Sequence, residues 1–339
     1  MSVEVGSRAA RSGRDYTAGV DLGATKIFSL VLDADGQEGG ADTRPTGADG
    51  GPEAVIANIV ASVEASLAQA GATQERLRGV GMAAPGPIDW QRGVVSEAPN
   101  MPGWHEVPLV RRLEEALGVP AWLENDADAA ALAEHRFGAG RGVRHMIFIT
   151  VSSGVGGGLI VDGRLHRGAS GAAGEVGHMV LNEKGPLCTC GNNGCLEAYA
   201  SGLAIAARAG EAIESGRSPT LARLALESPP LSAETVFRAA AAGDEVSQGI
   251  IGEAAHYLGL GMVNLVHIFN PELIVIGGGL SREGETFLGP ARRVVEQACF
   301  EQSRRGLRIV IGALGDRAGA LGAIAAMIEG RKRTPVGRV

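Results

Sequence analysis

The stretch over residues 174–197 constrains the fold most, because it gathers three of the four cysteines of the chain. A histidine lies in the same stretch, so the candidate side chains are those of His178, Cys188, Cys190 and Cys195. Glycines inside the stretch allow a short loop to fold back on itself. Three thiolates and one imidazole complete the tetrahedral Cys₃His shell of a structural zinc site, and such a closed shell leaves no position for a catalytic water. We therefore predict a structural Zn²⁺ loop over residues 178–197.

Two other interpretations of these cysteines are open: incidental burial, or one disulfide with a thiol left over. Residues 1–15 are polar and lack the apolar core of a secretory signal, so we expect a disordered leader and a cytoplasmic location. A reducing compartment favours metal-binding thiolates over a disulfide. The fourth cysteine, Cys299, is expected to be a small core residue.

Net charge and length limit the class of protein. The net charge of −7 argues against nucleic acids and membrane surfaces as partners. No uninterrupted apolar run reaches the ~18 residues of a membrane span. The 339 residues are enough for about two domains with sizeable cores. These features predict a soluble globular protein.

A glycine turn near the N-terminus is the first candidate ligand site. Residues 16–33 predict two strands joined by this turn, and its notable residues are Asp21, Gly23, Thr25 and Lys26. Backbone amides in such a turn can face phosphate oxygens, and an acidic side chain can hold hydrated Mg²⁺. A tight turn without a ligand is the alternative at this point.

Two further glycine turns follow later in the chain. One separates predicted strands at 144–151 and 159–161 and contains Ser153, Gly154 and Gly156. The other follows a predicted strand at 273–276 and begins with Gly277 and Gly278. Two such turns could hold a polyphosphate from both sides, whereas a single one could equally be a turn with no ligand.

Asp126 lies where a predicted strand over 119–123 leads into a predicted helix over 129–135. Ligands of open α/β sheets bind at the carboxyl ends of strands. The alternative role is that of a helix N-cap, for which Asn and Asp are both preferred. The run from Glu124 to Asp128 contains more polar residues than one cap needs, so a functional role is also open.

The remaining pattern alternates strands and helices. It predicts helices over 52–70, 107–117 and 312–329, strands over 77–83 and 308–311, and a polar loop over 41–51. Residues 198–265 are predicted to be helical, with breaks at 215–220 and 228–232.

Nine segments in chain order resemble the ROK family of sugar kinases and repressors, within the hexokinase–actin superfamily. The segments are DLGATK, APGPID, APNMPGW, ENDADAAAL, TVSSGVGGG, GEVGHM, CTCGNNGCLE, NPELIVIGGG and GDRAGALGA. They extend over residues 18–327, nearly the whole chain. The most specific of them is the pattern CxCGxxGCxE after GEVGH.

The resemblance implies an α/β, two-domain actin/hexokinase-like (ribonuclease H-like) fold with an active-site cleft between the domains. The expected bounds are 16–126 for a small N-terminal domain, completed by a C-terminal helix over 316–330, and 127–315 for a larger domain that carries the zinc loop.

The resemblance also implies roles for individual residues. Asp126 matches the catalytic base of the family. The residues at sugar-contacting positions are Gly86 (by its backbone), Asn100, Asn125, Asp126, Glu175, His178 and Glu197. The residues at nucleotide-contacting positions are Asp21, Gly23, Thr25, Lys26, Ser153, Gly154, Gly156, Gly277 and Gly278. His178 would both ligate zinc and face the sugar, and Asp128 stands where the family commonly has asparagine.

The implied activity is phosphorylation of the 6-hydroxyl of a hexose with ATP, Mg²⁺ and a structural Zn²⁺, in cytoplasmic glycolysis. Glucose is the expected substrate, with N-acetylglucosamine, N-acetylmannosamine and fructose as alternatives. A sugar-responsive repressor is the second class, but it needs a DNA-binding segment ahead of the first glycine turn, where we expect only the short leader. A zinc-stabilised sugar-binding protein without catalysis would not explain Asp126 together with three glycine turns. A homodimer or homotetramer is expected.

Overall fold

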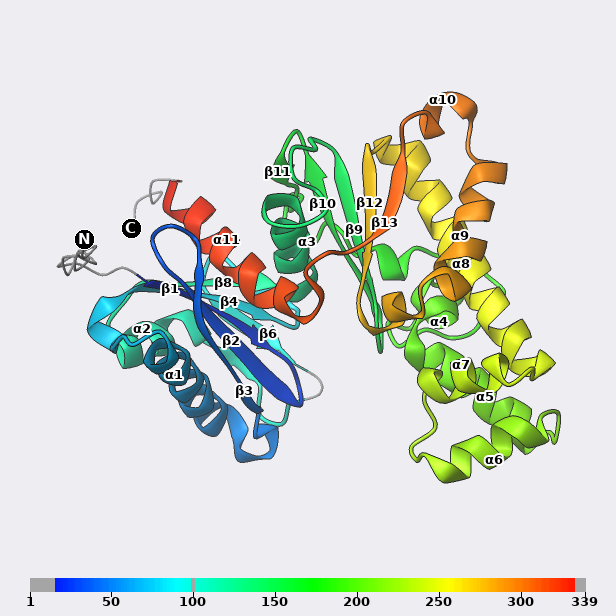
Figure 1. The fold of residues 1–339 in the computed structure, drawn as a ribbon, viewed down its shortest axis with the longest axis horizontal. Helices are drawn as coiled ribbons and strands as arrows, with labels where there is room; N and C mark the ends of the chain where they lie inside the picture. Colours follow the sequence, from blue (N-terminus) through cyan, green and yellow to red (C-terminus); the bar gives the residue numbers. More distant parts are fainter. Residues whose placement is uncertain (1–15, 99–100, 333–339) are drawn as a thin grey trace, which may run out of the picture. The chain divides into compact units, whose positions relative to one another are not determined.

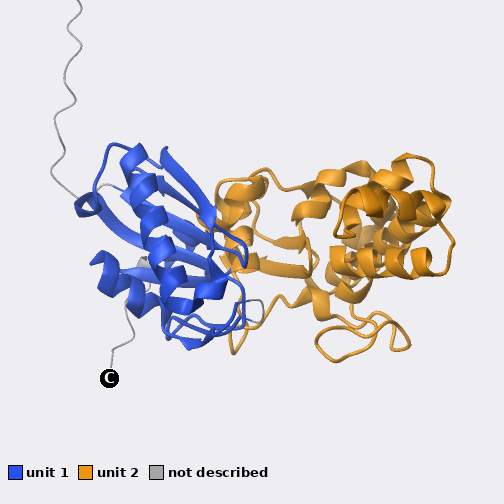
Figure 2. Cartoon of the chain, turned by 90° about the horizontal axis from the view of Figure 1, so that it is seen from below, with its two compact units in different colours: residues 1–125, 323–339 blue, residues 126–322 orange. Residues whose placement is uncertain are grey.

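The computed structural model describes residues 16–98 and 101–332, and these form two compact units (Figure 2). Unit 1 contains the described residues up to Asn125 and those from Ala323 onward, and unit 2 is Asp126–Gly322. The sequence predicted boundaries after residues 126 and 315, whereas the units divide after Asn125 and inside the last helix, α11 (Ala318–Lys332). That each unit is an independent domain stays a prediction.

Unit 1 is built on a five-stranded sheet with the order β3-β2-β1-β4-β8. The strands are β1 (Tyr16–Leu22), β2 (Lys26–Leu32), β3 (Glu38–Pro45), β4 (Leu77–Ala84) and β8 (Ala121–Asn125). The first three pair antiparallel, and β4 and β8 join β1 in parallel. A small sheet of β5 (Ile88–Asp89), β6 (Val94–Glu97) and β7 (His105–Val107) lies apart from it.

Helices of unit 1 pack on both faces of the large sheet. The helices α1 (Gly51–Gln69) and α2 (Leu109–Leu117) lie beside this sheet (Figure 1). Ile59 and Val63 of α1 are buried in one cluster with Val80 and Met82 of β4, and α2 adds its apolar side to this cluster. Alternate strand residues point to opposite faces. Gly81 therefore faces α11. A Cβ added to Gly81 would lie 2.0 Å from the carbonyl oxygen of Ala323 in that helix. Glycine at this position allows the helix to lie directly on the strand.

Unit 2 repeats this arrangement with a sheet of the order β11-β10-β9-β12-β13. Its strands are β9 (Met146–Val151), β10 (Val155–Val161), β11 (Arg164–Leu165), β12 (Leu273–Gly277) and β13 (Arg308–Ile311). As in unit 1, three consecutive strands pair antiparallel, and two more join in parallel. The helices are α3 (Asp126–Arg136), α4 (Glu197–Ala200), α5 (Gly202–Glu214), α6 (Pro219–Glu227), α7 (Ala233–Ala241), α8 (Glu245–Phe269), α9 (Glu285–Ala298) and α10 (Glu301–Arg304).

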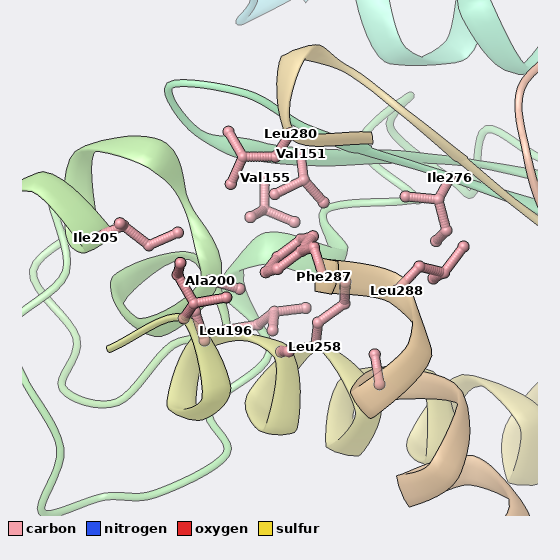
Figure 3. Packing of buried hydrophobic residues seen from close by; sticks show 14 of the residues in the cluster. Val151, Val155, Leu196, Ala200, Ile205, Leu258, Ile276, Leu280, Phe287 and Leu288 are labelled. Carbon is pink, nitrogen blue, oxygen red and sulfur yellow. The ribbon is translucent and has the colours of Figure 1, made fainter. Parts of the chain in front are cut away.

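The core of unit 2 lies between its sheet and the helices that follow the cysteine loop. Phe287 of α9 is 1% exposed and packs among side chains that include Leu258 of α8 and Leu288 (Figure 3). Val151 and Val155, which flank the turn between β9 and β10, belong to the same cluster. The turn is therefore fixed at both ends by buried side chains.

The structure corrects several predicted elements. The predicted polar loop over 41–51 begins as strand β3, which pairs with β2 along its whole length. The predicted glycine turn over 152–158 is shorter, because β10 already begins at Val155 and Gly156–Gly158 pair with β9. The helical stretch predicted over 198–265 is interrupted between α5 and α6 and between α6 and α7, as predicted, but α8 continues beyond it to Phe269. Cys299 is buried, as predicted.

Candidate active site and metal centre

The four predicted metal ligands lie together in unit 2. The ligand atoms of His178, Cys188, Cys190 and Cys195 are all within 4.8 Å of one another. Nδ1 of the histidine is 3.7 Å from Sγ of Cys188, and Sγ of Cys190 is 3.6 Å from Sγ of Cys195. Zn–S bonds of ~2.3 Å in a tetrahedron place two sulfurs ~3.8 Å apart, so the spacing fits one tetrahedral ion. All four cysteines are free thiols, which excludes the disulfide alternative.

The backbone of the cysteine loop is held by its own hydrogen bonds. Val180 pairs with Cys195 and Leu187 with Asn193 as isolated antiparallel bridges. Gly194 has φ +71°, and a Cβ there would lie 1.6 Å from the carbonyl oxygen of Asn182. Only glycine fits this crossing of the chain. The four ligand side chains are thereby positioned by the fold of the loop itself.

The thiols of the cluster differ in their tendency to ionise. The backbone amide of Asn192 lowers the pKa of Cys190 to about 7. Burial raises the pKa of the Cys195 thiol to about 12. A thiolate is the form that binds metal, and a cation would supply the charge compensation that the buried Cys195 lacks. The donor set therefore fits a soft divalent cation such as Zn²⁺.

Asp126 is the first residue of α3 and directly follows β8. Its Oδ1 accepts the backbone N–H of Ala127 at 2.8 Å, and the residue remains exposed. The helix dipole favours a carboxylate at this end of the helix. Asp128 differs, because it is only 4% exposed and its Oδ1 lies 3.1 Å from where a Cβ of Gly158 would be. An exposed and a buried carboxylate thus share one helical turn.

Further candidate residues of unit 1 lie at the carboxyl edge of its parallel strands. Asp21 is in register with Ala83 of β4, and Ala84 is in register with Asn125 of β8. A Cβ on Gly86 would lie 3.3 Å from Nδ2 of Asn125. This edge is where ligands of α/β sheets bind. Asn100 lies outside the described residues.

The first glycine turn is fixed by Thr46. The Thr46 hydroxyl donates to the carbonyl of Gly23 at 2.6 Å, and its backbone N–H donates to the carbonyl of Thr25 at 3.0 Å. The backbone N–H of Gly23 donates to the carbonyl of Lys26. The side chains of Thr25 and Lys26 are exposed at the turn, where a polar ligand can reach them.

The second and third glycine turns meet in unit 2. The strands that lead into them, β9 and β12, are neighbours, with Gly277 in register with Thr150. Gly278 has φ +83°, and a Cβ there would lie 2.4 Å from the carbonyl oxygen of Val151. The turn at Gly278 is therefore packed against the backbone at the end of β9, directly ahead of the turn over residues 152–154. Gly156 is instead a residue of strand β10. A Cβ added to it would lie 3.2 Å from the Cβ of Ala127.

The start of β10 gathers the remaining candidate residues. A Cβ on Gly177 would lie 2.0 Å from the carbonyl oxygen of Val155, so the segment from Glu175 to His178 packs on this strand end. Oε2 of Glu197 accepts the backbone N–H of Val155 at 2.9 Å. The sequence could not indicate this contact, because the donor is a backbone N–H, which residues of almost every type carry. Thr189, whose hydroxyl donates to Oε1 of Glu197 at 3.3 Å, was also missed.

Several known proteins are similar to this chain in sequence and in architecture. The sequence model of the ROK family matches residues 17–329. A glucokinase of Thermotoga maritima is 38% identical over 92% of the chain and 96% of that protein. A putative xylose repressor of Caldicellulosiruptor sp. is 35% identical over 82% of the chain and 69% of that protein. The crystal structure of a ROK family glucokinase from Streptomyces griseus in complex with glucose and AMPPNP is 34% identical, has a TM-score of 0.77, and covers 92% of this chain and 98% of that one.

The structural likeness confirms the predicted α/β fold of the actin/hexokinase type. Among the described residues, no helix is both long and apolar enough to cross a membrane.

Proposed function

The chain belongs to the ROK family, and from this membership we propose that it is an ATP-dependent hexose kinase that phosphorylates the 6-hydroxyl of glucose. The single observation that carries the proposal is the exposed Asp126 carboxylate at the β8–α3 junction. This carboxylate lies in a chain that is 38% identical to a glucokinase along nearly its whole length.

Asp126 is the proposed general base. A sugar hydroxyl is a weak nucleophile, and a carboxylate within hydrogen-bond reach accepts its proton while the new phosphorus–oxygen bond forms. The Asp126 side chain is exposed and its Oδ1 is oriented by the N–H of Ala127, so it is available to a bound hydroxyl. The proton moves from the sugar O6 to an oxygen of this carboxylate, while the bond from the γ-phosphorus of ATP to its bridging oxygen breaks and ADP leaves.

Polar side chains of several elements are assigned to the sugar. Carboxylates accept from hydroxyls, while amides and imidazoles can donate or accept. Gly86 contributes its backbone, and the side chains assigned to this role are those of Asn100, Asn125, Glu175, His178 and Glu197. In unit 2, the last three lie around the first residue of β10 and the cysteine loop, and this grouping supports their assignment.

The three glycine turns are assigned to the nucleotide. Phosphoryl transfer depends mainly on alignment and on neutralising negative charge. The residues assigned to ATP are Asp21, Gly23, Thr25, Lys26, Ser153, Gly154, Gly156, Gly277 and Gly278, and Asp21 would hold hydrated Mg²⁺. When bound, Mg²⁺ neutralises phosphate charge. The packing of the Gly278 turn on the end of β9 supports a shared role for the last two turns.

We assign Zn²⁺ to His178, Cys188, Cys190 and Cys195, as a structural ion that fixes the cysteine loop. A shell of four protein ligands is closed, so the ion supplies order and no reacting water. Thiolate ligands suit a reducing cytoplasm, and we place the enzyme there, at the entry of glycolysis, as a homodimer or homotetramer. Sedimentation velocity of the purified protein tests the assembly state.

A hexose panel tests the proposed function. Purified protein with ATP and Mg²⁺ is offered glucose, N-acetylglucosamine, N-acetylmannosamine and fructose, and ADP release is measured by a coupled assay. We expect glucose to give the highest kcat/KM and the product to be its 6-phosphate, identified by NMR. If another hexose is preferred, the substrate assignment is wrong; if none is phosphorylated, the kinase assignment is wrong.

A further inference from the structure

The turn between β9 and β10 is attached to the chain segment that leaves the cysteine loop. The backbone N–H of Gly202 donates to the carbonyl of Ser152 at 2.7 Å, and that of Leu203 donates to the carbonyl of Ser153 at 3.3 Å. Oε2 of Glu197 accepts the N–H of Val155 at 2.9 Å. Three hydrogen bonds from residues 197–203 therefore fix both sides of this turn.

The second oxygen of Glu197 faces the cysteine loop. Its Oε1 accepts from the hydroxyl of Thr189 at 3.3 Å and lies 3.9 Å from Sγ of Cys188. Glu197 also follows the metal-ligand position Cys195 closely in the chain. One carboxylate thus contacts the metal loop through Oε1 and the backbone of the turn through Oε2.

The position of Glu197 is fixed by its neighbours. Leu196 and Ala200 are both 0% exposed and share a buried cluster with Val151 and Val155, which flank the turn (Figure 3). A Cβ on Gly154 would lie 2.6 Å from Oε2 of Glu197. The carboxylate therefore fills the space beneath the turn and cannot move away without exposing an unpaired N–H.

We propose that Glu197 is a positioning residue for the nucleotide turn, in addition to any contact it makes with the sugar. Its carboxylate holds residues 152–155 in one conformation, with the N–H of Val155 turned inward toward the protein. The inference rests on the proposed kinase function only in assigning this turn to ATP. As a consequence, the conformation of the cysteine loop affects nucleotide binding through the side chain of Glu197.

Nucleotide binding without sugar separates this role from a sugar contact. Affinity for AMPPNP with Mg²⁺ is measured by calorimetry for wild type, Glu197→Ala and Glu197→Gln. Loss of a hydrogen bond to a charged group weakens binding about tenfold, and we expect this in the alanine variant. Glutamine keeps an oxygen that can accept the Val155 N–H, so Glu197→Gln should bind AMPPNP nearly as tightly as wild type.

Glu175→Ala is the matched control, because it removes another carboxylate assigned to the sugar. Among the described residues, the side-chain hydrogen bond to Val155 comes from Glu197, and none joins the Glu175 side chain to the turn. We expect this variant to lose sugar affinity and keep AMPPNP affinity. A comparable loss of AMPPNP affinity in Glu175→Ala, or none in Glu197→Ala, would overturn the proposal, as would a glutamine variant as weak as the alanine one.

Hydrogen exchange decides the same question without any nucleotide. Backbone amide exchange in a peptide covering residues 150–158 should rise about tenfold in Glu197→Ala and stay near the wild-type rate in Glu197→Gln. Unchanged exchange in the alanine variant, with wild-type folding by circular dichroism, contradicts the positioning role. If wild type binds no AMPPNP at all, the kinase assignment fails, while this exchange comparison still decides the role of Glu197.

Discussion

Asp126 is the residue on which the proposed chemistry depends, and Asp126→Asn isolates its role as base. Asparagine keeps the size and the helix-capping ability of aspartate but cannot accept the proton. Removing a general base typically costs ~10²–10⁴-fold, and we expect kcat to fall by this amount while the Kd for the sugar changes little. The check is steady-state kinetics together with calorimetry; a variant that keeps more than about a tenth of wild-type kcat would falsify the assignment.

Glu272 predicts a pH dependence of stability. The backbone N–H groups of Arg144 and His145 donate to its Oε1 at 2.8 and 3.0 Å, and these bonds lower the pKa of this carboxyl below its ordinary value of 4.5. A lowered pKa in the folded state adds stability that is fully present above the ordinary value. That stability is lost as the pH falls below 4.5 and through the folded-state pKa.

Urea unfolding of Glu272→Gln and wild type at several pH values measures this contribution. The difference in unfolding free energy between them should be largest at neutral pH and shrink below pH 4.5, because protonated glutamate resembles glutamine. Glu301→Gln is the control, since Glu301 is exposed and its contact with Arg305, at 3.5 Å, lies on the surface. A difference that stays constant with pH in Glu272→Gln contradicts the assigned cause.

Two strands that the sequence did not predict in full, β3 and the first half of β10, contain glycines that serve close packing. The strand β3 contains two adjacent glycines, Gly39 and Gly40, and a Cβ on Gly40 would lie 2.4 Å from the carbonyl oxygen of Ser66 in α1. Similarly, a Cβ on Gly158 of β10 would lie 2.6 Å from Cβ of Ala131 in α3. Such requirements depend on a helix distant in sequence, so no local pattern contains them.

The candidate site was predictable where residue type carries the chemistry. Three cysteines and a histidine at short spacing indicated the metal cluster, and the structure brings their ligand atoms together. The strand–helix junction at Asp126 followed from hydrophobic periodicity and is observed. The link from Glu197 to the turn at Val155 was not predictable, because its partner is a backbone N–H whose position depends on the packed core.

At the level of the cysteine loop, Cys190→Ser tests what the metal supports. Metal binding in a structural site contributes directly to folding. We expect metal analysis to find about one Zn²⁺ per wild-type chain and far less in the variant. The variant should have a lower Tm and a higher KM for the sugar, and through Glu197 a weaker affinity for AMPPNP. Cys299→Ala is the control, because this buried cysteine lies outside the cluster and its loss should leave the metal content unchanged.

A local role of the metal predicts a different outcome. If Cys190→Ser loses its metal and some thermal stability but keeps the wild-type KM and AMPPNP affinity, the loop is a separate stabilising feature. Wild type that contains no zinc when prepared without chelators contradicts the zinc assignment itself.

At the scale of the whole molecule, α11 is a single helix that belongs to both units. Within unit 2, Gly322 packs on α3, where a Cβ would lie 1.7 Å from the carbonyl oxygen of Ala129. Within unit 1, the helix lies on Gly81 of β4, and near its end a Cβ on Gly330 would lie 2.6 Å from the ring of Trp122. Because the helix is continuous, we infer that a defect at its unit 2 end also lowers the stability of unit 1.

The three tryptophans make this inference measurable, since Trp90, Trp104 and Trp122 all lie in unit 1. Gly322→Ala introduces overpacking, which costs about 1–3 kcal/mol or more. We expect it to move the urea midpoint seen by tryptophan fluorescence to lower urea together with the midpoint seen by circular dichroism. Gly252→Ala in α8 is the control: it meets open space and should stabilise its helix by about 0.5–1 kcal/mol. A fluorescence midpoint that stays at the wild-type value while the circular dichroism midpoint falls would show that the two units unfold independently despite their shared helix.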